Sequence, residues 1–147
     1  MADTTAIRTL FPALQGECAV TSSDSENYNC IAWAAGDVTR WWWPIDGYWP
    51  QGVERRRTVE CFVAAFRTLG YEPCEDDAVE LGYEKVAIYA DRLDRPTHMA
   101  RQLGSGWWTS KLGECADVTH RLAGLEGPGL VNYGRTVKVL RRRRIES

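Results

Sequence analysis

The sequence has few of the residues from which metal sites and disulfide frameworks are built. It holds two histidines and five cysteines, and the cysteines are widely spaced. Structural zinc sites draw four ligands from closely spaced Cys and His residues, so we expect no metal and no cofactor. An odd number of scattered cysteines predicts free thiols rather than disulfide bonds if the compartment is reducing.

Targeting and membrane signals are also lacking. The N-terminal residues show neither the basic nor the apolar segment of a secretory signal peptide. No apolar run approaches the roughly 20 residues that cross a bilayer. The formal net charge of -2 gives no sign of a nucleic-acid partner. We therefore expect a single cytoplasmic domain over residues 1–147, with no membrane and no nucleic acid as partner, and the oligomeric state stays open.

Tryptophan, by contrast, is abundant. The chain holds seven, and five of them fall in two clusters, at 41–43 and 107–108. Prolines and glycines interrupt residues 37–57 repeatedly, so this stretch is expected to be a loop with large anchoring side chains. Such a loop can line a substrate groove, for which Trp42 is the candidate, or it can pack over a small core.

Hydrophobic periodicity predicts an α+β fold. Apolar residues at helical spacing predict a helix over 58–69, and a polar run predicts the start of a shorter helix over 27–35. Further elements are expected as strands over 85–90, 97–103, 107–112 and 136–141 and as a short helix over 118–125. This order favours a small antiparallel sheet with helices packed on one face.

Cys30 is the candidate nucleophile. It falls in the first turn of the predicted helix 27–35, where the helix N-terminus lowers the pKa of a thiol. The thiol needs a base, and only His98 and His120 can serve. His98 begins a predicted strand, whereas His120 falls on a helix that we expect to be exposed. We therefore take His98 as the base and His120 as structural.

Several segments resemble a family of uncharacterised bacterial domains. They are Tyr28–Ala34, Trp41–Pro44, Gly82–Tyr89, Pro96–His98 and Trp108–Gly113. More remotely, the order of a helix with a cysteine, a strand, a strand with a histidine and another strand is similar to that of NlpC/P60 enzymes. This likeness implies a papain-like (NlpC/P60-like) order of elements.

The same likeness implies a third catalytic residue, which orients the imidazole from the strand after His98. Ser110 is our choice for it. Gln102, which alternates onto the same face of the strand as His98, and Asp117 stay open as alternatives.

These residues predict cysteine-dependent amide or acyl chemistry by a hydrolase or an acyltransferase. His98 would take the thiol proton, and the Cys30 thiolate would attack a carbonyl carbon of the substrate. His98 would then return the proton to the leaving group as a thioester forms on Cys30. A peptide, amide or small-molecule substrate would contact Tyr28, Trp42 and Gln102. Two alternatives stay open: a non-catalytic interaction module of the immunity or antagonist type that uses the Trp-rich loop, and a biosynthetic enzyme acting on a small molecule.

Overall fold

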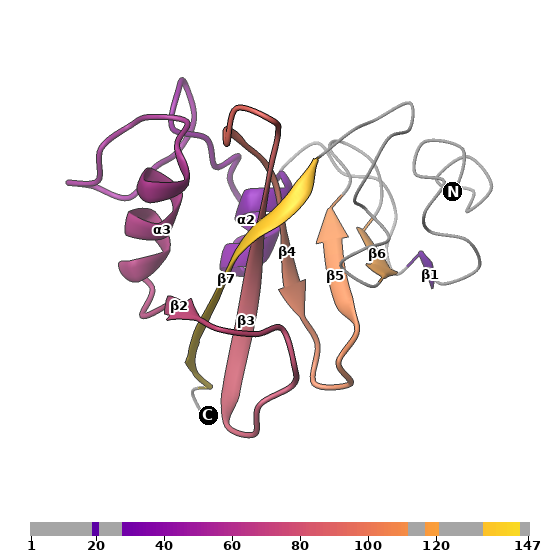
Figure 1. Cartoon of the computed structure of the whole chain (residues 1–147). Helices are drawn as coiled ribbons and strands as arrows, with labels where there is room; N and C mark the ends of the chain where they lie inside the picture. The colour runs from indigo at the N-terminus through magenta and orange to yellow at the C-terminus, as the bar shows by residue number, and fades with distance from the viewer. Residues whose placement is uncertain (1–18, 21–27, 112–116, 121–133, 145–147) are drawn as a thin grey trace.

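The computed structural model describes residues 19–20, 28–111, 117–120 and 134–144 (Figure 1). Within these residues, strands and helices alternate irregularly along the chain. In sequence order they are β1 (Ala19–Val20), α2 (Cys30–Ala35), α3 (Val59–Arg67), β2 (Glu72–Cys74), β3 (Tyr83–Ala90), β4 (Pro96–Gln102), β5 (Trp108–Lys111), β6 (Asp117–His120) and β7 (Arg135–Arg143).

The described strands form one antiparallel sheet in the order β1-β6-β5-β4-β3-β7-β2. Strands β3 to β6 pair with their neighbours along the chain. Strand β7 returns to pair with β3 on one side and β2 on the other. Because β1 and β2 are no longer than three residues, five longer strands make up the body of the sheet. The predicted α+β fold with an antiparallel sheet is confirmed.

The helices predicted over 27–35 and 58–69 are both present, as the shorter α2 and α3, and a polar side chain caps the start of each. The side chain of Asn29 caps α2 by accepting from Ala32 N, and Gly36 ends the helix with a φ of 82°, which glycine adopts without strain. The Thr58 side chain caps α3 in the same way, by accepting from Cys61 N. Cys30 lies in the first turn of α2, as predicted, but the helix begins at Cys30 itself and not at residue 27.

The helix predicted over 118–125 is wrong in the part that the structure describes. Asp117–His120 is strand β6, which pairs with β5 on one side and β1 on the other. The helix was predicted from three apolar residues at helical spacing. The β-branched residues Val118 and Thr119 favour a strand instead, and their backbone pairs with β5 and with β1. Residues 121–125 lie outside the described part of the chain.

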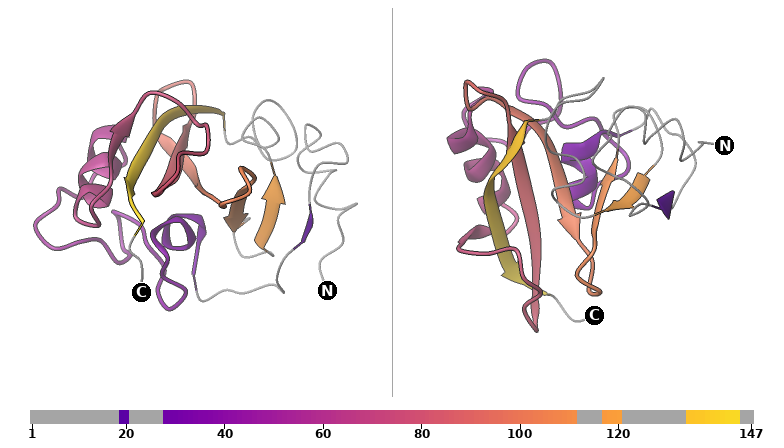
Figure 2. Two further views of the ribbon diagram at one scale, coloured as in Figure 1. Left: turned by 90° about the horizontal axis from the view of Figure 1, so that it is seen from below. Right: turned by 45° about the vertical axis from the view of Figure 1, so that its right-hand side comes forward.

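Both faces of the sheet carry buried side chains, and α2 and α3 pack on the same face. Val86, Ile88, Met99 and Leu140 pack with the side chains of α2 and α3 in the main hydrophobic core. Figure 2 shows α2 end-on beside the curved sheet. Residues that alternate with these core residues along the strands point to the opposite face. They too are buried, and they include Ala87, Tyr89, His98, Ala100, Ser110 and His120.

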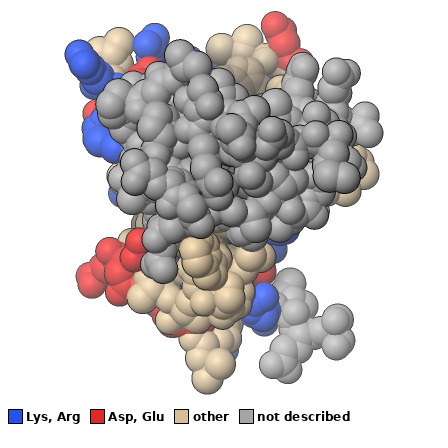
Figure 3. Space-filling model, turned by 90° about the vertical axis from the view of Figure 1, so that its right-hand side faces the viewer, with Lys and Arg blue, Asp and Glu red and all other residues tan. Residues whose placement is uncertain are grey.

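None of the helices in the described residues is long and apolar enough to span a membrane. On the side of the molecule drawn in Figure 3, acidic and basic side chains both appear among the coloured residues, and neither sign forms a broad field there.

Candidate functional site

Cys30 packs on the helix-covered face of the sheet. It is only 8% exposed and belongs to the main hydrophobic core together with Tyr28 and Ile31. Beside it, Asn29 Oδ1 accepts a hydrogen bond from Ala32 N at 3.0 Å, which caps the helix. The polar residue before Cys30 therefore has a structural role at the start of α2.

His98 lies on the opposite face of the sheet. Its neighbour Met99 packs in the core with α2, and the Arg101 guanidinium carbon lies 4.5 Å from the centre of the Trp33 ring of α2. Successive side chains of a strand point to opposite faces, so His98 points away from α2. The sheet thus separates the His98 side chain from the face on which Cys30 packs, and the structure does not assemble the predicted pair.

Ser110 does lie where a residue that orients His98 is expected. Its Oγ is 2.9 Å from His98 Nε2 and 2.6 Å from His120 Nε2. The three residues come from the adjacent strands β4, β5 and β6, and each is fully buried. The ring of Tyr89 meets that of His98 edge-on, with 5.4 Å between the ring centres. Both histidines of the chain therefore converge on one serine hydroxyl.

His120 was missed as a member of this cluster because its segment was predicted as an exposed helix. In a strand it is buried, and it pairs with Trp108 across the sheet. The serine hydroxyl carries one proton, so it donates to one imidazole while it accepts from the other. Burial, and then the neighbouring His120, hold the pKa of His98 well below its ordinary value. The cluster therefore keeps His98 neutral at physiological pH.

The residues predicted to bind substrate do not share one groove. Tyr28 stacks on Trp33 beside α2, with 5.8 Å between the ring centres. Trp42 is 3% exposed and is part of the main core. Gln102, on the same strand face as His98, donates from Nε2 to the backbone oxygen of Asp77 at 2.6 Å. It therefore does not take the place of Ser110 beside the histidines. The alternative Asp117 lies on β6, where the structure describes its backbone only.

The Trp-rich loop, residues 37–57, is fixed to α2 by buried hydrogen bonds. Asn29 Nδ2 donates to Trp42 O at 2.6 Å, and Asn29 Oδ1 accepts from Trp42 N at 3.1 Å. The Trp42 indole donates to Asp37 Oδ2 at 2.9 Å, and the Trp49 indole donates to a backbone carbonyl of the same loop at 3.0 Å. One asparagine side chain thus joins the start of the helix to the loop.

Asp37 is the charged anchor of the loop. Partial burial by itself raises the pKa of its carboxyl group, but hydrogen bonds from Thr39, Trp42 and Arg40 outweigh burial and hold the pKa below its ordinary value. The carboxylate is therefore ionised throughout the physiological range and keeps its bond to the Trp42 indole.

The same loop leaves three large apolar side chains exposed. They are Val38 at 48%, Trp41 at 39% and Ile45 at 57%, and we call them the loop surface. Backbone bonds between Tyr48 and residues 41 and 43 close the turn that carries Ile45. The guanidinium of Arg40 stacks on the Tyr48 ring at 3.6 Å. The loop surface is therefore presented by a fixed backbone.

The model of the domain of unknown function DUF7689 matches residues 19–141 of this chain. The chain belongs to this family. The match spans both helices and reaches into β7, so it covers the sheet described above. Comparisons with curated proteins and with solved structures gave no match. The similarity to NlpC/P60 enzymes gains no support from them and stays a prediction.

Proposed function

We propose that this domain is an interaction module that binds another protein through the loop surface. The observation that carries the proposal is that Asn29 and Asp37 fix the loop by hydrogen bonds to Trp42, while Val38, Trp41 and Ile45 stay exposed on it. A rigid loop loses little conformational entropy when it binds, so exposed apolar groups on it are well suited to recognition.

The composition around the loop surface supports a protein partner. Tryptophan and arginine are enriched among the residues that dominate binding energy at protein interfaces. The Trp-rich loop carries two arginines besides Trp41: Arg40 stacks on Tyr48, and Arg55 donates to the backbone oxygen of Gly47 at 3.0 Å. A partner that fits offers an apolar pocket for Trp41 with carbonyl or carboxylate oxygens at its edge.

Replacing Trp41 with alanine is expected to weaken partner binding at least tenfold, which is about 1.4 kcal/mol, without unfolding the domain. The partner is first captured in the native host by a photo-crosslinking amino acid placed at position 45, next to Trp41 in the loop. The captured protein is then purified, and its dissociation constant for the wild type and for Trp41→Ala is measured by calorimetry.

Leu93 supplies the matched control. It is 72% exposed at the turn between β3 and β4, outside the loop surface. Leu93→Ala should bind like the wild type, and a crosslinker at position 93 should not capture the same protein. The proposal fails if positions 45 and 93 capture the same proteins, or if the purified partner binds Trp41→Ala as tightly as the wild type.

The cysteine-dependent hydrolase or acyltransferase, with its papain-like order of elements, stays a prediction, as does the biosynthetic enzyme acting on a small molecule. One observation favours such chemistry: Ser110 holds His98 Nε2 as a third catalytic residue would. The position of Cys30 on the other face of the sheet weighs against the predicted pair, because His98 could act as its base only within hydrogen-bond reach.

Alkylation separates the two functions. With iodoacetamide at pH 6, Cys30 in the folded protein is expected to react no faster than Cys61, which is also buried. Burial shields both thiols from the reagent, and only an activated thiolate would react rapidly at that pH. Peptide mapping by mass spectrometry gives the rate at each cysteine. If Cys30 alone reacts rapidly, its thiol is activated, and the thiol enzyme replaces the interaction module as the better function.

A further inference from the structure

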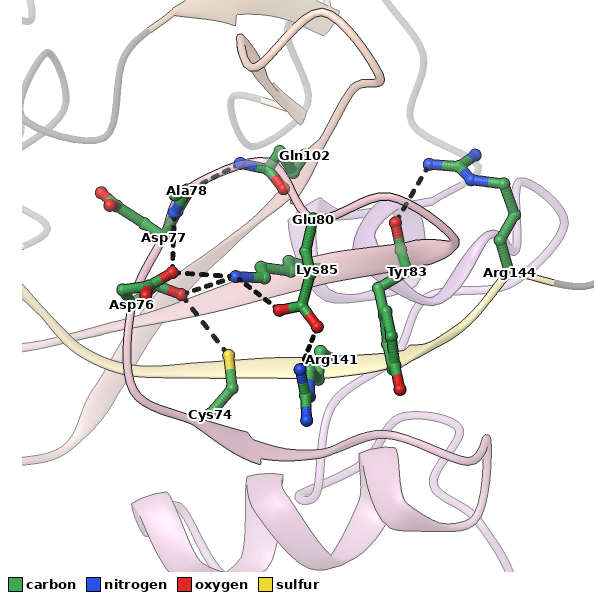
Figure 4. A network of polar contacts seen from close by, with 10 residues as sticks. All are labelled: Cys74, Asp76, Asp77, Ala78, Glu80, Tyr83, Lys85, Gln102, Arg141 and Arg144. Atoms are coloured by element: carbon green, nitrogen blue, oxygen red, sulfur yellow. Dashed lines mark hydrogen bonds and ion pairs between the residues drawn. The ribbon is translucent and has the colours of Figure 1, made fainter.

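A polar cavity of about 310 Å³ lies between the β2–β3 connection and β7, away from the loop surface (Figure 4). Its volume falls at the lower end of small-ligand sites. The charged and reactive side chains that line it are Cys74, Glu75, Asp76, Glu80, Lys85 and Arg141. Both signs of charge therefore meet in one small space.

Lys85 fixes the wall of this cavity. Its side chain is 1% exposed, and Nζ donates to the backbone oxygen and to Oδ1 of Asp76, at 3.0 and 3.1 Å. Glu80 Oε1 lies 3.6 Å from the same nitrogen. The two hydrogen bonds and the ion pair hold the ammonium group of Lys85 against the acidic side chains of the wall.

Arg141 and Glu75 keep hydrogen-bonding capacity that the wall does not use. The Arg141 guanidinium donates to Glu80 through Nη1 and lies over the Tyr83 ring, with its carbon 4.4 Å from the ring centre. That stacking orients the remaining N–H groups of the guanidinium. The exposed carboxylate of Glu75 makes no hydrogen bond or ion pair with the described residues. One cation and one anion therefore remain available at the cavity.

We propose that this cavity binds a small zwitterion of the amino-acid class. The ligand carboxylate would accept hydrogen bonds from Arg141, and its ammonium group would donate to Glu75. A simple anion would meet the carboxylates of Glu75 and Asp76, and a simple cation would meet Lys85 and Arg141. Only a ligand with both charges matches both unused groups. This site does not depend on the interaction through the loop surface.

The Cys74 thiol provides the readout because it lines the same cavity and is partly exposed. Burial raises the pKa of this thiol, so its alkylation is slow and easily followed. The rate of Cys74 modification by N-ethylmaleimide is measured by peptide mapping in the presence of L-alanine, 4-aminobutanoate or 6-aminohexanoate. Butanoate and butylamine, which carry only one of the two charges, are the controls. At least one zwitterion should protect Cys74 at a concentration ten times lower than either control needs.

Two variants make the test specific. Glu75→Gln removes the proposed ammonium acceptor and should abolish the advantage of the zwitterion over butanoate. Glu72→Gln removes an exposed carboxylate on β2 that does not line the cavity, and it should leave protection unchanged. The proposal is overturned if no zwitterion protects Cys74 at a lower concentration than butanoate and butylamine do. It is also overturned if the zwitterion protects Cys74 equally well in both variants and in the wild type.

Discussion

Replacing Asn29 with alanine is expected to lower the free energy of unfolding by about 3 kcal/mol. The side chain makes three bonds: it caps α2 at Ala32 N, and it both accepts from and donates to the backbone of Trp42. Loss of the cap alone costs about 1 kcal/mol. The backbone N–H and C=O of Trp42 then lose a partner in a buried region, which adds a penalty of about 1 kcal/mol or more for each. Urea denaturation at pH 7.5 measures the total.

Thr58 offers the matched control for this experiment. Its side chain caps α3 by accepting from Cys61 N at 3.2 Å, and it makes no hydrogen bond to another loop among the described residues. Thr58→Ala should therefore cost only the capping energy of about 1 kcal/mol. The difference between the two variants reports the link between α2 and the Trp-rich loop. Equal losses would show that Asn29 is a cap and nothing more.

Lowering the pH from 8 to 5 is expected to remove about 2 kcal/mol of stability through His98 alone. In the folded state, burial and then His120 keep the pKa of His98 well below 6.5, so the imidazole stays neutral. In the unfolded chain the imidazole binds a proton below about pH 6.5. The unfolded state therefore binds more protons in this range, and stability is fully present above pH 6.5 and falls as the pH decreases. Urea denaturation at several pH values measures the slope.

His98→Gln is the control, because glutamine cannot titrate and can still bond to Ser110. This variant should be less stable at pH 8 but should lose about 2 kcal/mol less than the wild type on acidification. Below pH 4 both proteins should lose stability together, since hydrogen bonds hold the pKa of Asp37 and of Asp91 below the ordinary value. Equal slopes between pH 8 and 5 would show that His98 takes up its proton over the same pH range in the folded and the unfolded state.

Local signals in the sequence located α2, α3 and the central strands to within a few residues. A capping side chain before the first turn and a glycine after the last fix α2. The apolar stripe of α3 gave its position, and the runs that became β3 and β4 were recognised from their β-prone residues. These signals depend on neighbours within a few residues, so they can be read without knowing the fold.

Short edge elements could not be read in this way. Strand β2 contains Pro73, which argues against a strand unless it lies at the edge of a sheet, and β2 is indeed the last strand on its side. Strand β6 has only four residues, too few to show alternation before its neighbours are known. Its assignment changed the environment of His120 from an exposed helix to the buried partner of Ser110.

The sequence by itself determined that Cys30 lies in the first turn of a helix, that His98 and Ser110 lie on successive strands, and that tryptophans anchor a loop. Which of these side chains meet was decided only by the tertiary structure. A strand sends alternate residues to opposite faces, and the choice of face depends on where the helices pack. That choice put Cys30 and His98 on different sides of the sheet. The same packing brought both histidines to one serine hydroxyl.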